Sequence, residues 1–376
     1  MGLSSWKQRG RRAVAAAALT AIAVSGTAGW ASGQEQRPLT GPPPGTASWR
    51  ADDSLGRGLP DPATARPAQV AAFFRGLSAA EQRALVARHP SVVGNLDGAP
   101  VALRYEANAL SLRAEQARSR ADAKDRTLTE QQRTSARALA DRCSQLLAQG
   151  RRILAFDPRG RGQVAEVYGD LETARHVSVI VPGSDIDLGT FDRTRDVYGT
   201  PAGMARSLHR ATAGRTAVVA WAGYTTPVGL GPDAATGRLA EAGAPRLARF
   251  AQGLTAAGAP KPTVFCHSYG SVVCGLAASR LPAADLVALG SPGMHADTVA
   301  ELHTRARVWA ARDNSDWIGK VPNVELFGLG HGTDPTDPSF GARRVPAEQA
   351  QGHTGYFAPG TDSLRAFADI ATGAAS

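Results

Sequence analysis

The amino-acid sequence predicts an α/β fold in which helices cover both faces of a mostly parallel sheet. From residue 153 onward, short apolar runs alternate with helical stretches, which is typical of parallel strands joined by crossover helices. An antiparallel hairpin opens this series, and a long helical region precedes it. The later strands are expected at residues 177–181, 217–221, 263–265, 286–289, 307–310 and 324–329.

The first 31 residues are expected to be a secretory signal peptide. A basic start that includes Arg11 and Arg12 precedes an apolar stretch at residues 13–24, and small residues then lead to a cleavage site after Ala31. The alternative is an uncleaved membrane anchor, although the stretch is short for a spanning helix of about 20 residues. The sequence therefore predicts a secreted or cell-envelope protein, which could include peripheral association with the envelope.

The charge distribution does not indicate nucleic-acid binding. Of the formal net charge of +9, four units come from basic residues that precede the first acid, which leaves +5 for the rest of the chain. No basic run is interleaved with aromatic residues, so the arginines are interpreted as solvated surface groups. Residues 160–165 match a dinucleotide-binding pattern, but they lie in an expected hairpin turn that no helix follows. We therefore expect no cofactor and no metal.

Three cysteines, Cys143, Cys266 and Cys274, could form one disulfide in an exported protein. Pairing of Cys143 with either of the other two is one interpretation, and three reduced, buried thiols are the other. The sequence does not separate these alternatives. The cysteine spacing lacks the C-x-x-C pattern that would suggest a zinc site.

The region before the sheet divides into two parts. Residues 32–66 are rich in proline and glycine, which predicts a disordered linker. Residues 67–150 are predicted to form a helical lead-in segment, in which Ser78 caps one helix and Thr129 caps the last. Residues 151–376 then form the α/β domain.

The α/β domain opens with a predicted hairpin. Residues 153–156 and 164–168 have strand-like patterns and flank a turn-forming segment at residues 157–162. An opening hairpin followed by parallel strands is the strand order of the α/β-hydrolase fold.

Residues 265–270, with the sequence Phe-Cys-His-Ser-Tyr-Gly, are the strongest functional signal. They follow an apolar strand and precede a helix-like stretch, so Ser268 is expected at the apex of a tight turn. This is the arrangement of a nucleophile elbow, G-x-S-x-G, in which small residues let strand and helix pack closely under the serine. Cys266 replaces the first glycine and is small enough for this packing.

A serine nucleophile requires a base, an acid that orients the base, and donors for the oxyanion. In this fold the acid follows the serine along the chain, and the loop after the strand at residues 307–310 contains Asp313 and Asp316. We prefer Asp316 because it lies within the loop proper, whereas Asp313 is nearer to the end of the strand. Either residue could instead be a turn-forming aspartate.

The base is expected between the last strand and the last helix, where His331 and His353 both lie. We prefer His353, because its glycine-flanked loop leads into the closing helix and could carry the imidazole over the serine. His331 is then expected at the rim of the site, and His267 in packing or hydrogen bonding. The backbone N–H groups of Tyr269 and Ser184 are the candidate donors of the oxyanion hole.

Several motifs together resemble an actinobacterial α/β-hydrolase family that is catalogued as a domain of unknown function. The resemblance extends from residue 67 to the C-terminus. It implies a serine-hydrolase fold with Ser268 as the nucleophile and implies little about the substrate. The motifs that carry it are His89-Pro90, Asn95-Leu96-Asp97-Gly98, residues 153–158, Val181-Pro182-Gly183, Cys266-His267-Ser268-Tyr269-Gly270-Ser271, Ala288-Leu289-Gly290-Ser291-Pro292-Gly293, His331-Gly332-Thr333-Asp334-Pro335, Phe340-Gly341-Ala342 and Gly352-His353-Thr354-Gly355-Tyr356-Phe357.

The sequence therefore predicts an exported serine hydrolase that cleaves an ester or related acyl bond of a small-molecule or lipid-like substrate. Ser268, His353 and Asp316 would form the catalytic triad, with His331 and Asp313 as alternative members. An acyltransferase would have the same sequence features. A non-catalytic hydrolase-fold protein that binds a partner at the cell envelope is the other alternative, because fold alone does not fix function.

Overall fold

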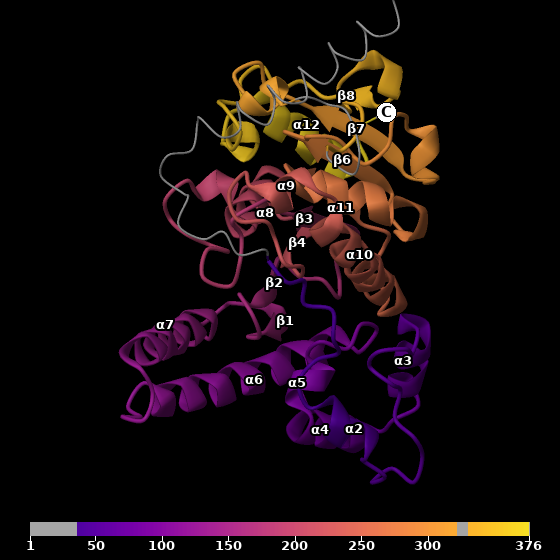
Figure 1. Ribbon diagram of the computed structural model, residues 1–376. Helices are drawn as coiled ribbons and strands as arrows, with labels where there is room; N and C mark the ends of the chain where they lie inside the picture. Colours follow the sequence, from indigo (N-terminus) through magenta and orange to yellow (C-terminus); the bar gives the residue numbers. More distant parts are fainter. Residues whose placement is uncertain (1–35, 322–329, 376) are drawn as a thin grey trace, which may run out of the picture.

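The computed structural model describes residues 36–321 and 330–375, so the expected signal peptide and the strand expected at residues 324–329 lie outside the described residues. Within these ranges, an eight-stranded sheet has the order β1-β2-β4-β3-β5-β6-β7-β8 (Figure 1). The strands are β1 (Ile153–Asp157), β2 (Gln163–Tyr168), β3 (His176–Val181), β4 (Thr216–Ala222), β5 (Thr263–His267), β6 (Asp285–Leu289), β7 (Arg307–Ala311) and β8 (Arg343–Arg344).

The pairing of these strands confirms the predicted fold class. β1 and β2 form the expected antiparallel hairpin, and β2 also pairs antiparallel with β4. All later pairs, from β4–β3 to β7–β8, are parallel. The two-residue edge strand β8 was not predicted from the sequence, because so short a strand has no periodicity to detect.

Strand side chains alternate between two apolar layers, which explains why helices cover both faces of the sheet. Val179 and Val264 belong to a core with α10 and α11, whereas the adjacent Ile180 and Phe265 belong to a second core with α8 and α12. The covering helices are α8 (Pro201–Ala211), α10 (Arg238–Ala256), α11 (Gly270–Ala277) and α12 (Asp362–Ala371).

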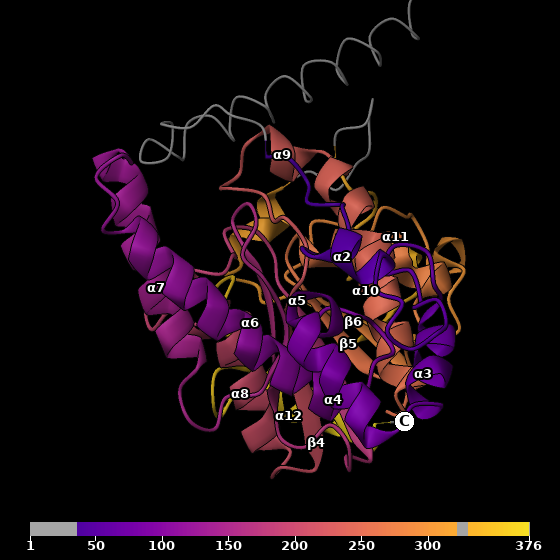
Figure 2. The ribbon, with the colours of Figure 1, turned by 90° about the horizontal axis from the view of Figure 1, so that it is seen from below.

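The predicted helical lead-in precedes the sheet and lies beyond β1, at the opposite end of the sheet from β8 (Figure 1). Seen from below, its helices α4 and α6 lie in front of the sheet (Figure 2). Its helices begin where the sequence predicts, because Ser78 Oγ accepts the Glu81 N–H and Thr129 Oγ1 accepts the Gln132 N–H. None of the helices in the described ranges has the length and apolar composition needed to span a bilayer. The helices are α2 (Thr46–Arg50), α3 (Pro67–Arg75), α4 (Ala79–Arg88), α5 (Pro90–Val93), α6 (Val101–Asp122) and α7 (Glu130–Leu146).

Residues 36–66 differ from the disordered linker that their composition predicted, because they pack onto the folded molecule. Trp49 is fully buried, and its indole N–H donates to Pro60 O at 2.8 Å. Its ring meets the edge of the His89 ring at a centroid distance of 5.4 Å. One buried tryptophan therefore anchors a segment whose overall composition is that of a loose chain.

The helical segment is joined to the sheet by side-chain hydrogen bonds to the outer edge of β1. Asn95 Oδ1 accepts the Phe156 N–H at 3.1 Å, and Asn95 Nδ2 donates to Phe156 O at 2.8 Å. Asn108 Nδ2 donates to Ile153 O at 3.2 Å. These asparagines satisfy backbone groups that an open sheet edge would otherwise expose, so the helices and the sheet form one packed unit.

Candidate active site

Ser268 lies at the apex of the turn between β5 and α11, as the elbow motif predicts. Its φ is 55°, in the left-handed region that non-glycine residues rarely adopt, and its N–H donates to Leu289 O at 3.0 Å. Gly270 has no room for a side chain, because a Cβ there would lie 2.5 Å from Val181 O. The start of α11 therefore packs directly against the end of β3, and this close packing holds the serine in its strained conformation.

His353 is brought to this serine by the loop between β8 and α12. Its Nε2 lies 2.8 Å from Ser268 Oγ. Its Nδ1 lies 2.9 Å from Asp316 Oδ1 and 3.1 Å from Asp316 Oδ2. The structure thus brings together Ser268, His353 and Asp316, in the relative positions that nucleophile, base and orienting acid require.

The Asp316 carboxylate is fully buried and extensively hydrogen-bonded. Oδ1 accepts the Ile318 N–H at 2.9 Å, and Oδ2 accepts the Tyr356 hydroxyl at 2.6 Å. Burial raises the pKa of this carboxyl, but the hydrogen bonds from His353, Tyr356 and Ile318 outweigh burial and hold the pKa below its ordinary value. Asp316 is therefore ionised at neutral pH and can stabilise a positive charge on the imidazole.

The position of the His353 imidazole is also fixed by two rings and a backbone contact. His267 Nε2 lies 2.7 Å from His353 O, and the two imidazole centroids are 4.8 Å apart. Trp317 packs on His353 with a centroid distance of 4.6 Å. Burial lowers the pKa of His267 to about 3, so its neutral imidazole donates this hydrogen bond, in the packing and hydrogen-bonding position expected for it.

The candidate oxyanion donors lie on two sides of the serine. A Cβ at Gly183 would lie 2.5 Å from Ser268 Cβ and 2.9 Å from Ser268 Oγ, so the loop after β3 approaches the nucleophile through a glycine. Ser184 follows in this loop, and Tyr269 begins α11. Neither of their backbone N–H groups has a hydrogen-bond acceptor among the described residues, which leaves both available to a ligand.

His331 and Asp313, the alternative members of the triad, have other contacts. His331 Nε2 lies 2.8 Å from Ala234 O, and its ring meets the edge of the Tyr269 ring. Asp313 Oδ1 accepts the N–H groups of Ser315 at 3.0 Å and Gly352 at 3.2 Å. Asp313 therefore ties the loop after β7 to the loop that carries His353.

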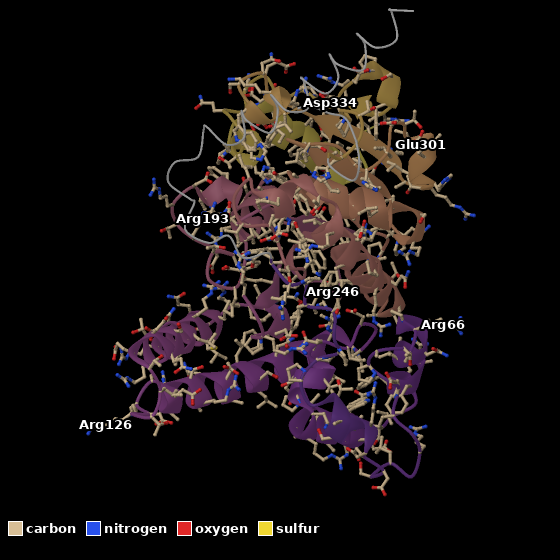
Figure 3. All side chains as sticks on the ribbon, viewed as in Figure 1. Arg66, Arg126, Arg193, Arg246, Glu301 and Asp334 are labelled. Carbon is tan, nitrogen blue, oxygen red and sulfur yellow. A yellow bond between two sulfur atoms is a disulfide. The ribbon has the colours of Figure 1, made fainter. Side chains whose placement is uncertain are left out.

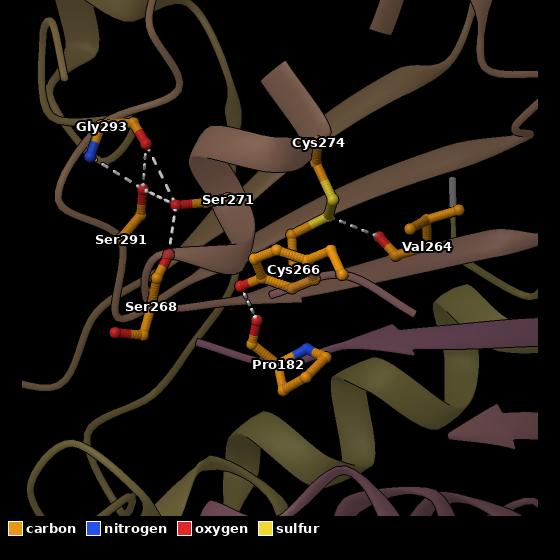
Figure 4. The surroundings of a disulfide bond; sticks show 9 residues. Pro182, Val264, Cys266, Ser268, Ser271, Cys274, Ser291 and Gly293 are labelled. Carbon is orange, nitrogen blue, oxygen red and sulfur yellow. Dashed lines mark hydrogen bonds between the residues drawn. A yellow bond between two sulfur atoms is a disulfide. The ribbon is translucent and has the colours of Figure 1, made fainter. Parts of the chain in front are cut away.

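The structure joins Cys266 to Cys274 in a disulfide (Figure 4), a pairing that the sequence did not suggest. Cys266 is in β5 and Cys274 is in α11, and the reversal at the elbow brings their Cα atoms to 6.4 Å, within disulfide range. Cys143 is a buried thiol, and burial raises its pKa to about 11. The bond thus links the strand before the nucleophile to the helix after it.

A serine cluster supports the other side of the elbow (Figure 4). Ser271 Oγ donates to Ser268 O at 2.6 Å and lies 2.6 Å from Ser291 Oγ. Ser291 Oγ also accepts the Gly293 N–H at 3.0 Å. The motif at residues 290–293, which the sequence left without a role, therefore packs against the elbow.

Comparison with known proteins agrees with this architecture. Residues 157–326 match a family model described as alpha/beta hydrolase. This part of the chain is similar to α/β-hydrolases. This similarity, together with the observed fold, supports a hydrolase-type function.

Two similar proteins come from two strains of Mycobacterium tuberculosis, and both are described as uncharacterized. Each is 31% identical to this chain over 380 residues, an alignment that covers 84% of this chain and 57% of the relative. This chain thus spans little more than half the length of these relatives. Their source agrees with the predicted resemblance to an actinobacterial family.

Proposed function

We propose that this chain is an exported serine hydrolase that cleaves an ester or related acyl bond through an acyl-enzyme. The observation that carries the proposal is the 2.8 Å contact between Ser268 Oγ and His353 Nε2. This distance allows the imidazole to accept the hydroxyl proton directly. The buried Asp316 carboxylate on the far side of the imidazole supports the same assignment.

In the first half of the reaction, Ser268 Oγ attacks the acyl carbon while His353 Nε2 takes its proton. Asp316 keeps the imidazole in the tautomer that carries the other proton on Nδ1, and stabilises the imidazolium that forms. The N–H groups of Tyr269 and Ser184 donate to the oxyanion of the tetrahedral intermediate. His353 then protonates the leaving oxygen, and the acyl group remains on Ser268.

In the second half, a water molecule attacks the acyl-enzyme and His353 accepts its proton. Collapse of the second tetrahedral intermediate releases the acid and restores the serine hydroxyl. An acyltransferase would use the same residues with an alcohol or amine in place of water. Product analysis with and without added alcohol distinguishes hydrolysis from transfer.

The proposed export rests on the basic start and apolar stretch of residues 1–31, which lie outside the described residues. The Cys266–Cys274 disulfide supports it, because such bonds persist mainly in oxidising compartments. Release of the mature protein into the medium, or its retention in the envelope fraction, tests this part of the proposal.

Labelling with a fluorophosphonate probe tests the catalytic proposal directly. The wild-type chain should be labelled, whereas Ser268→Ala and His353→Ala should not. His331→Ala is the matched control, and it should keep most of the labelling. Undiminished labelling of Ser268→Ala, or loss of labelling in His331→Ala alone, would contradict the assignment. A panel of p-nitrophenyl esters of graded acyl length then measures substrate preference.

A further inference from the structure

A cavity of about 350 Å³ lined by both apolar and charged side chains lies between the helical segment and the sheet. This volume falls within the range of roughly 300–1,000 Å³ that is usual for small-molecule sites. Its walls include the hairpin of β1 and β2, helix α10 and the packed arm at residues 40–43. Figure 3 shows Arg246, one of its lining residues, at this junction. Ser268, His353 and Asp316 do not line the cavity.

The charged side chains around the cavity do not balance. Two carboxylates, Asp97 and Asp157, and four guanidinium groups line it. Three of these guanidinium groups pair with one of the two carboxylates, at N–O distances of 2.6–3.7 Å. Arg246 is the fourth, and it forms no ion pair with any carboxylate in the part of the chain that the structure describes.

Arg246 is instead held by neutral acceptors. Its Nε donates to Gly223 O at 2.6 Å, and one Nη donates to Gln163 Oε1 at 2.5 Å. Burial lowers the pKa of this guanidinium, and the charges of Asp97 and Asp157 only partly offset the cost of desolvation. The guanidinium retains further N–H groups that these two bonds do not use.

Gln163 supplies a second donor without an acceptor. The residue is 5% exposed, and its Nε2 has no hydrogen-bond partner among the described residues. The contact from Arg246 to Oε1 fixes the orientation of the amide, so Nε2 is the free end. Buried donors are nearly always satisfied in folded proteins, and an acceptor atom in the cavity would satisfy this one.

We propose that this cavity binds a small oxyanion, a carboxylate or phosphate group, between Arg246 and Gln163. Such a group would neutralise the unpaired guanidinium and accept the free amide N–H. The planar fork of arginine fits either kind of oxyanion through two parallel hydrogen bonds. The site is separate from the Ser268 site, so it does not depend on the proposed hydrolysis.

Isothermal titration calorimetry of the full chain at constant ionic strength tests the site. Inorganic phosphate and acetate serve as probes, and sodium chloride keeps the ionic strength equal. Saturable binding of at least one probe is expected, and the tighter probe identifies the oxyanion as phosphate or carboxylate. Absence of saturable binding of both probes overturns the proposal.

Gln163→Glu places a carboxylate beside Arg246 without changing the size of the side chain, and should weaken binding about tenfold or more. Gln132→Glu is the matched control, because residue 132 is exposed and its side-chain oxygen can still accept the Thr129 N–H. This control should bind like the wild type. Arg246→Gln provides a second test by removing the charge, and should also weaken binding. Wild-type affinity in both Gln163→Glu and Arg246→Gln would place the ion elsewhere and overturn the proposal.

Discussion

At the residue scale, the two aspartates of the loop after β7 differ in what their carboxylates contact. The Asp316 carboxylate accepts hydrogen bonds from the imidazole of His353, the hydroxyl of Tyr356 and one backbone N–H. The Asp313 carboxylate accepts hydrogen bonds only from backbone N–H groups and a serine hydroxyl of the surrounding loops. The same residue type therefore serves the proposed chemistry at one position and loop structure at the other.

Replacement of Asp316 by asparagine should lower kcat for ester hydrolysis by about three to four orders of magnitude, because the amide would favour the wrong tautomer of His353. Asp313→Asn is the control, and it should lower kcat far less because its carboxylate does not reach the imidazole. Steady-state kinetics with a p-nitrophenyl ester measures both variants. Equal losses of kcat in the two variants would mean that Asp316 does not orient His353.

His267 should make the stability of the protein depend on pH. Its pKa is lowered from 6.5 to about 3 in the folded state, so the unfolded chain binds a proton in this range that the folded chain does not. The free energy of unfolding should therefore fall as pH decreases from about 6.5 toward 3, by about 1.4 kcal/mol per pH unit from this residue.

Urea unfolding of the wild type and of His267→Gln between about pH 6 and pH 4 measures this contribution. The variant should show a shallower dependence on pH, because glutamine does not titrate. Its amide can still donate to His353 O, so the elbow should keep its structure. An unchanged slope would mean that His267 is not buried in its neutral form.

At the scale of elements, the elbow is held by close contacts on both sides. The loop after β3 reaches Ser268 through Gly183, and the disulfide between β5 and α11 connects the two elements that carry the serine. These contacts restrict the nucleophile to one position. The proposed activity should therefore be sensitive to changes that leave the triad residues intact.

Gly183→Ala should lower the rate of fluorophosphonate labelling about a hundredfold, because its methyl group would displace Ser268 or the oxyanion loop by a fraction of an ångström or more. The control is Gly231→Ala, since a Cβ at Gly231 would have no neighbour within 4 Å. Labelling kinetics of both variants would be compared with the wild type. A Gly183→Ala chain that reacts at the wild-type rate would argue against the close approach.

Removal of the disulfide in a Cys266→Ala/Cys274→Ala variant should lower the free energy of unfolding by roughly 2–3 kcal/mol. The estimate follows from the loop that the bond closes in the unfolded chain, which has a sequence separation of 8. Denaturant unfolding under non-reducing conditions measures the difference. Stability equal to that of the wild type would indicate that the bond does not form in solution.

At the scale of the whole molecule, the helical segment packs on the edge of the sheet that β1 forms. Asn95 makes two hydrogen bonds to the backbone of Phe156 in β1, and residues 36–66 cover both parts through Trp49 and the contact of Leu39 N–H with Thr225 Oγ1. The helices therefore protect the β1 edge of the sheet, at the opposite end from β8.

Asn95→Ala should lower the free energy of unfolding by about 1–3 kcal/mol, because it leaves backbone groups of β1 without partners. Tryptophan fluorescence and far-ultraviolet circular dichroism should report one coincident transition in the wild type. Asn314→Ala, at an exposed loop position, is the control and should change stability little. Separate transitions for the two signals would show that the helical segment unfolds independently.

The sequence predicts the features that depend on local patterns. Apolar strands, the hairpin, the elbow around Ser268 and the helix cap at Thr129 each follow from neighbouring residues, and the structure contains them. The preference for His353 over His331 followed from the position of its loop before the last helix. The structure places His353, not His331, at hydrogen-bond distance from Ser268.

Other features depend on distances that no local pattern encodes. The Cys266–Cys274 pairing follows from the reversal at the elbow, and the packing of residues 36–66 depends on one tryptophan within a loose composition. Tyr356 and Trp317 contact the catalytic candidates through loop geometry, and neither residue type marks a hydrolase. The close approach of Gly183 to Ser268 likewise depends on the pairing of β3 with β5, which no local pattern reveals.

The disulfide between Cys266 and Cys274 is inaccessible to redox reagents in the folded protein. Both half-cystines are fully buried, and exchange requires that an attacking thiolate reach one of the sulfur atoms. A reductant or oxidant added to the native protein cannot make that approach until the chain opens. The redox state of this pair therefore reports the compartment in which a molecule folded, whatever environment it enters afterwards.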